Sequence, residues 1–156
     1  MNDATLIAIR NFRRLDVRVA TAGQPTEEQL LAVAAAGFRS VINLALPTST
    51  DALADERASV TALGLDYVHI PVDFAAPTTA DYAKFASAMD ARRGQSVFVH
   101  CAANYRVSAF MAIYRVKTLG CGHAAALAEM REVWEPDAAW SRFLAEQLSA
   151  THAFAG

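Results

Sequence analysis

The chain has 156 residues, of which 54% are hydrophobic, so it can bury a substantial core as one domain. Its 14 basic and 16 acidic residues give a net charge of −2, and no Lys/Arg-rich run stands out, so we expect no nucleic-acid partner. No apolar run is long enough to span a membrane, and residues 1–14 lack the apolar region of a signal peptide. We therefore expect no membrane association and a cytoplasmic location.

Residue types that bind metals or form disulfides are scarce. The two cysteines, Cys101 and Cys121, and the four histidines show no spacing typical of a metal site. This argues against a disulfide scaffold and fits a reducing compartment, in which a thiol stays usable. We expect neither a metal nor an organic cofactor.

Strand-like and helix-like segments alternate along the chain, which is typical of an α/β fold. We expect one domain over residues 1–156, with its ends at 1–14 and 150–156 loosely ordered. It should contain a single central, mostly parallel sheet of four or five strands, flanked by about six helices. In chain order, the expected elements are a strand at 15–20, a helix at 27–36, a strand at 40–44, a helix at 51–63, a strand at 66–70, a helix at 79–91, a strand at 96–100, and helices at 107–119, 123–134 and 138–148.

The most informative segment is 97–108, in which a run of β-formers ends in His100 and Cys101. A short loop and Arg106 follow, and then an apolar helix begins. The loop amides and the first turn of that helix point N–H groups at one spot, where the helix dipole favours negative charge. Such a field favours a thiolate and binds an oxyanion. The segment therefore predicts a nucleophilic cysteine in a phosphate-binding loop made of Ala102, Ala103, Asn104, Tyr105 and Arg106. The alternative is a buried cysteine at a strand end, with the arginine on a solvated helix face.

These residues resemble the signature loop of the protein tyrosine phosphatase superfamily, which reads His-Cys, five residues, Arg, then Ser or Thr. Arg106 stands five positions after Cys101, one fewer than is usual in the family, and Ser108 falls where the family has its hydroxyl. Asn104 takes the place of the usual Gly, and Asn is the residue that best tolerates the positive φ expected there. Four residues between Cys and Arg is also the spacing of many rhodanese-type sulfurtransferases.

Upstream segments favour the phosphatase. The stretches 20–26, 37–44 and 67–73 occur in the order found in small bacterial dual-specificity-like phosphatases. Together with the Cys101 loop, this resemblance covers roughly residues 15 to 118.

A cysteine phosphatase needs a nucleophile, an oxyanion-binding arginine and a general acid. Cys101 and Arg106 fill the first two roles. We choose Asp73 as the acid, because it follows the 66–70 strand, which we expect beside the Cys101 strand. It lies 28 positions before Cys101, and in the resembling family the acid precedes the cysteine by about thirty. Asp81 is the alternative, although an Asp is expected in the first turn of a helix for the dipole alone.

The resemblance also implies supporting roles. His100 would set the loop geometry and favour the thiolate, and Ser108 would donate its hydroxyl to the thiolate as phosphate leaves. Ser108 can instead bond back to a helical carbonyl. Tyr105 either lines the mouth of the site or packs into the core.

The sequence thus predicts a metal-independent phosphatase that acts on a phosphorylated protein (phosphotyrosine, phosphoserine or phosphothreonine) or on a small phosphoester. Two alternatives stay open. One is a rhodanese-like sulfurtransferase with a persulfide on Cys101, and the other is a degenerate module that binds phosphate without turnover.

Overall fold

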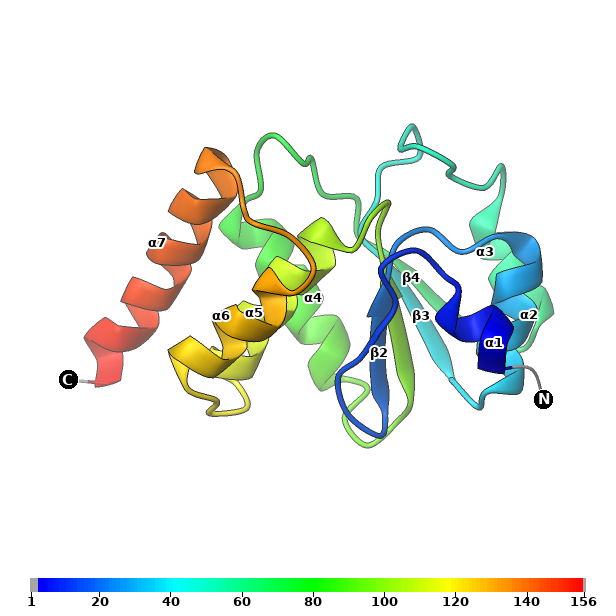
Figure 1. The fold of residues 1–156 in the computed structure, drawn as a ribbon, viewed down its shortest axis with the longest axis horizontal. Coiled ribbons are helices and arrows are strands. Elements are labelled where there is room, and N and C mark those ends of the chain that lie inside the picture. The colour runs from blue at the N-terminus through cyan, green and yellow to red at the C-terminus, as the bar shows by residue number, and fades with distance from the viewer. Residues whose placement is uncertain (1–2, 156) are drawn as a thin grey trace.

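A five-stranded sheet forms the centre of the molecule (Figure 1). The structure, a computed structural model, describes residues 3–155, with side chains through residue 149. The sheet has the order β1-β2-β5-β3-β4, antiparallel between β1 and β2 and parallel elsewhere. The strands are β1 (Arg13–Arg14), β2 (Val19–Ala22), β3 (Ser40–Asn43), β4 (Asp66–His69) and β5 (Val97–His100).

Helices cover both faces of the sheet, so the predicted α/β fold is confirmed. Figure 1 shows the first three helices on one face and the last four on the other. Seven helices occur within residues 3–155: α1 (Asp3–Ile7), α2 (Glu27–Ala35), α3 (Glu56–Ala62), α4 (Thr79–Asp90), α5 (Tyr105–Lys117), α6 (His123–Arg131) and α7 (Ala138–Ala155). None of them is long and apolar enough to cross a membrane.

The central strand β5 sends alternate side chains to the two faces, because a strand has a period of two. Val97 and Val99 join the core under α4 to α7, and Phe98 joins the core under α1 to α3. By the same alternation His100 faces the α3 side. The α4–α7 side is built around α5, where Phe110 is fully buried among aromatic rings such as Phe85 and Trp140.

The neighbour of the Cys101 strand was predicted wrongly. We expected the 66–70 strand beside it, but β3 lies between β4 and β5 and pairs with both. The loop after β4 still reaches the site, because Val72 N donates to Leu44 O at 3.0 Å just beyond the end of β3.

Element starts differ from the prediction where a side chain caps the backbone. The expected 15–20 strand begins only at Val19, because the Asp16 carboxylate accepts the N–H groups of Arg18 and Val19 and forms a turn. The expected 51–63 helix begins at Glu56, where Asp55 Oδ1 accepts the N–H of Ala58.

The expected loose order of residues 1–14 and 150–156 stays a prediction. Residues 3–14 form α1 and β1, and Leu6 and Ile9 are buried. Helix α7 continues through 150–155, and residues 1, 2 and 156 lie outside the described part.

Candidate active site

The site forms where the parallel strands end, the edge at which α/β sheets present their ligands. Cys101 follows β5 directly and is fully buried. Its N–H donates to Ala22 O at the end of β2 (3.3 Å), and His100 O accepts from Leu44 N at the end of β3 (2.9 Å). The nucleophile candidate is thus held by strands on both sides.

Asn104 turns the chain from the strand into helix α5. Its φ is +70°, the left-handed conformation that its position predicted. Its side-chain Nδ2 donates to Asn11 O (2.9 Å) and Thr21 Oγ1 (3.0 Å), so the side chain points away from the loop mouth. Because α5 begins at Tyr105, two residues earlier than predicted, Arg106 lies in its first turn.

The loop carbonyls are occupied by upstream residues. Ala102 O accepts from Gln24 N (3.0 Å), and Ala103 O accepts from Asn11 Nδ2 (2.9 Å). In a trans peptide the N–H points opposite to the C=O. The N–H groups of these two peptides therefore point away from Gln24 and Asn11. Gly23 packs directly against this loop, and a Cβ there would lie 2.6 Å from Ala102 O.

Arg106 carries a buried and incompletely satisfied charge. The residue is 5% exposed, and its Nη1 donates to Val72 O at 2.9 Å. Within the described part of the chain, no carboxylate pairs with its guanidinium and its Nε has no hydrogen-bond partner. An unpaired buried charge is costly, so an anion bound here would be strongly favoured.

A pocket of about 190 Å³ joins these groups. Five of the residues that line it were predicted for the site or its loop: Cys101, Ala102, Ala103, Tyr105 and Arg106. The sixth, Phe74, was not predicted. The pocket therefore places a cysteine and an arginine among apolar and aromatic side chains.

Asp73 lies next to this pocket but not in its lining. It is exposed, and its Oδ1 accepts the N–H of Ala75 at 2.9 Å. Its neighbours are held firmly, because Val72 O accepts from Arg106 and Phe74 O accepts from Trp140 Nε1 at 2.7 Å. Its role as the acid stays a prediction.

Aromatic rings build one wall of the pocket. Tyr105 stacks on Trp134 with ring centroids 4.5 Å apart and planes 2° apart, and it lines the pocket as well. Phe74 contacts both rings and also faces the Arg106 guanidinium. The distance from Arg106 Cζ to the centroid of the Phe74 ring is 5.8 Å. Both roles considered for Tyr105, pocket lining and packing, therefore occur together.

His100 belongs to a buried network that sequence reasoning missed. Its Nε2 donates to Glu56 Oε2 at 2.5 Å, and its Nδ1 lies 3.2 Å from Cys101 O. Both ring nitrogens of the buried imidazole therefore lie next to an oxygen atom. Gln24 Nε2 donates to Glu56 Oε1 at 2.9 Å. The sequence did not single out Glu56, because no local pattern pairs it with a histidine 44 positions away.

Burial disfavours the Glu56 carboxylate, which is 7% exposed, but the hydrogen bond and charge of His100, with the Gln24 hydrogen bond, outweigh it. The pKa of Glu56 therefore lies below its usual value. Within the described residues, no three His, Cys, Asp or Glu side chains gather as a metal site.

Ser108 bonds within its own helix. Its hydroxyl donates to Tyr105 O at 3.0 Å, and it lines a separate small cavity with Met111 and Met130. Donation to the Cys101 thiolate stays a prediction.

Residues 9–143 match the family described as PTP-NADK, DSP-PTPase phosphatase fused to NAD+ kinase. The chain belongs to this family. The predicted membership of the protein tyrosine phosphatase superfamily is thereby confirmed.

Solved structures share its fold. A DUF442 protein from Shewanella putrefaciens CN-32 is 34% identical, with a TM-score of 0.85 over 96% of this chain and 99% of that one. PTPMT1 in complex with PI(5)P is 20% identical (TM-score 0.77; 93% and 99% covered). TpbA of P. aeruginosa in complex with pTyr is also 20% identical (TM-score 0.65; 78% and 72% covered).

One curated relative is longer. The Beta-lactamase hydrolase-like protein of Agrobacterium fabrum is 35% identical over 92 residues, which are 56% of this chain and 21% of that protein. The chain spans about a fifth of that protein's length.

Gly23→Ala tests the close packing under the loop. The new Cβ would lie 2.6 Å from Ala102 O and 3.0 Å from Ala103 Cα, so the loop backbone has to move. We expect stability to fall by about 1–3 kcal/mol and phosphatase activity to fall at least about tenfold. Gly122→Ala is the matched control, because a Cβ there meets nothing within 4 Å. Equal effects of the two changes, in urea unfolding and in activity assays, would contradict the packing account.

Glu56→Gln tests the buried pair with His100. Because the folded pKa of Glu56 is lowered, its stabilisation is complete above the unfolded pKa and is lost as pH falls through the folded pKa. The variant should lose about 3 kcal/mol of unfolding free energy near pH 7, and the difference from wild type should shrink below about pH 4. Urea unfolding at both pH values measures this, with the exposed Glu146→Gln as control. A difference that stays constant with pH would disprove the charged pairing.

Proposed function

We propose that this protein is a metal-independent cysteine phosphatase that hydrolyses phosphate monoesters through a phosphocysteine on Cys101. The observation that carries the proposal is the buried Arg106 guanidinium, which has no carboxylate partner in the described chain and an unused Nε donor. It lines one small pocket with Cys101 at the start of α5. Membership of a phosphatase family supports this assignment.

In the first step the Cys101 thiolate attacks phosphorus in line with the leaving oxygen. The P–S bond forms as the P–O ester bond breaks, and Asp73 gives its proton to the leaving alcohol. Arg106 and the N-terminal amides of α5 hold the equatorial oxygens, on which the transition-state charge develops.

In the second step water attacks the phosphocysteine. The Asp73 carboxylate takes a proton from that water, the P–S bond breaks, and inorganic phosphate leaves with the thiolate restored. The reaction consumes one water and one ester and yields one alcohol and one phosphate, so no external oxidant or reductant is needed.

His100 and Glu56 support the nucleophile from the α3 side of the sheet. His100 Nε2 bonds to Glu56 Oε2, and its Nδ1 lies 3.2 Å from Cys101 O, so the buried pair fixes the backbone that carries the nucleophile. The pair acts through Cys101, and neither His100 nor Glu56 is itself a lining residue of the pocket.

The substrate is a phosphorylated protein or a small phosphoester. The pocket of about 190 Å³ holds a phosphoryl group and the first atoms beyond it, and its rim offers the aromatic faces of Phe74 and Tyr105. Structures of the same fold hold pTyr in TpbA and PI(5)P in PTPMT1, so the fold itself allows chemically different esters. We propose that phosphotyrosine and phosphoserine or phosphothreonine side chains both fit.

Cys101→Ser should abolish hydrolysis of p-nitrophenyl phosphate measured with EDTA present, because the hydroxyl is a far weaker nucleophile. Arg106→Lys should lower kcat/KM about 10²–10³-fold, since a lysine lacks the planar fork. Cys121→Ser is the matched control and should keep full activity.

Three outcomes would overturn this proposal. Activity that survives in Cys101→Ser removes the nucleophile. Thiocyanate formation from thiosulfate and cyanide, without ester hydrolysis, would indicate a sulfurtransferase. Tight vanadate binding without turnover would indicate a phosphate-binding module.

Asp73→Asn tests the general acid through the leaving group. Phenyl phosphate expels a poor leaving group that needs a proton, whereas p-nitrophenolate leaves readily without one. The variant should therefore lose about 10²-fold in kcat/KM, which reports the first step alone, on phenyl phosphate and clearly less on p-nitrophenyl phosphate. Asp51→Asn is the control, because that residue has φ of +62°, which Asn tolerates. An equal loss on both esters would remove the acid role from Asp73.

A further inference from the structure

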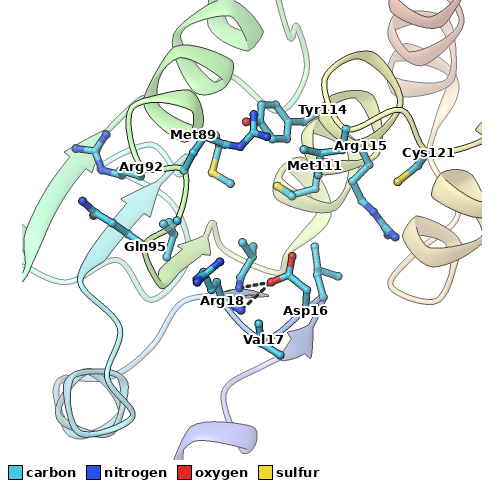
Figure 2. Close-up of a pocket in the computed structure, with 16 residues that line it drawn as sticks. Asp16, Val17, Arg18, Met89, Arg92, Gln95, Met111, Tyr114, Arg115 and Cys121 are labelled. Atoms are coloured by element: carbon cyan, nitrogen blue, oxygen red, sulfur yellow. Dashed lines mark hydrogen bonds between the residues drawn. The ribbon is translucent and has the colours of Figure 1, made fainter.

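A second and larger cavity lies near the N-terminal ends of β2 and β5, whereas Cys101 follows the C-terminal end of β5. It has a volume of about 400 Å³, against about 190 Å³ for the Cys101 pocket. It is lined by the turn before β2, the first residue of β5, the end of α4 and the last two turns of α5 (Figure 2). Its size falls in the range of small-molecule sites.

The interior of this cavity is apolar. Figure 2 shows Met89 of α4 and Met111 of α5 pointing toward each other across it. Methionine side chains adapt readily to the shape of a ligand. At the rim, Val17 is 86% exposed and Leu119 is 44% exposed, so an apolar ligand would remove both from water.

The rim of the cavity is cationic, although the whole chain has a net charge of −2. Four arginines line it, Arg18, Arg92, Arg93 and Arg115, together with a single carboxylate, Asp16. The Asp16 carboxylate already accepts two backbone N–H groups.

Two of the four arginines are committed to carboxylates elsewhere. Arg92 pairs with Asp66 and points away from the cavity in Figure 2, and Arg93 pairs with Asp90. In the described part of the chain, the guanidinium groups of Arg18 and Arg115 have no hydrogen-bond or ion-pair partner. These two charges are available to a ligand.

We propose that this cavity binds a small amphipathic anion, with its apolar body between Met89 and Met111 and its carboxylate, sulfonate or phosphate group at the rim that Arg18 and Arg115 make cationic. The apolar interior and the two unpaired cations complement the two halves of such a molecule. The site does not depend on the chemistry assigned to Cys101, because it shares no lining residue with that pocket.

The test uses anilinonaphthalene sulfonate as the anionic probe and phenylnaphthylamine as its uncharged counterpart. Both are titrated by fluorescence against wild type and the Arg18→Gln, Arg115→Gln double variant. The double variant should bind the sulfonate about tenfold more weakly and the uncharged arene equally well. The matched control is Arg10→Gln with Arg142→Gln, which removes two exposed arginines outside the lining.

Cys121 reports where the probe binds. It lines the cavity, and in Cys101→Ser it is the sole cysteine. Saturating sulfonate probe should slow its alkylation by iodoacetamide about tenfold. Unchanged alkylation, unchanged affinity in the double variant, or an equal loss in the control would each overturn the proposal. An equal loss for the uncharged arene would also overturn it.

Discussion

The buried charge of Arg106 is the constraint on which the site depends. A guanidinium that is 5% exposed needs compensation, and the described chain offers it one carbonyl, Val72 O, and a cation–π contact with Phe74. Both belong to the segment that carries Asp73. The arginine therefore joins the loop after Cys101 to the loop after β4, although β3 separates the two strands. The compensation it still lacks is a negative charge, which a phosphoryl group would supply in the proposed reaction.

Strand alternation explains how the opposite side of Cys101 is organised. Because β5 sends Phe98 and His100 to one face, the imidazole meets Glu56 at the start of α3, while Cys101 continues into the core under α5. A carboxylate and an imidazole thus lie on one side of the nucleophile and a guanidinium on the other. The loop keeps its shape because Gly23, Gln24 and Asn11 contact its backbone from the upstream segment.

Local signals predicted much of this arrangement. The positive φ of Asn104 and the order of loop and helix after β5 follow from residues close in sequence. The order of the strands does not, because it is set by pairing between residues far apart along the chain, and β3 pairs with both β4 and β5. The Glu56–His100 pair and the burial of α1 were also missed, because they join residues far apart along the chain.

The central claim is that Cys101 carries the phosphoryl group during turnover. The most direct measurement is rapid acid quenching of the enzyme with p-nitrophenyl phosphate, followed by mass spectrometry of the peptide that contains Cys101. The account predicts one phosphoryl group on Cys101, accumulating further in Asp73→Asn, which hydrolyses the intermediate slowly. A phosphoryl group on another residue would contradict the claim. So would an active enzyme in which no phosphorylated Cys101 can be trapped, either in wild type or in Asp73→Asn.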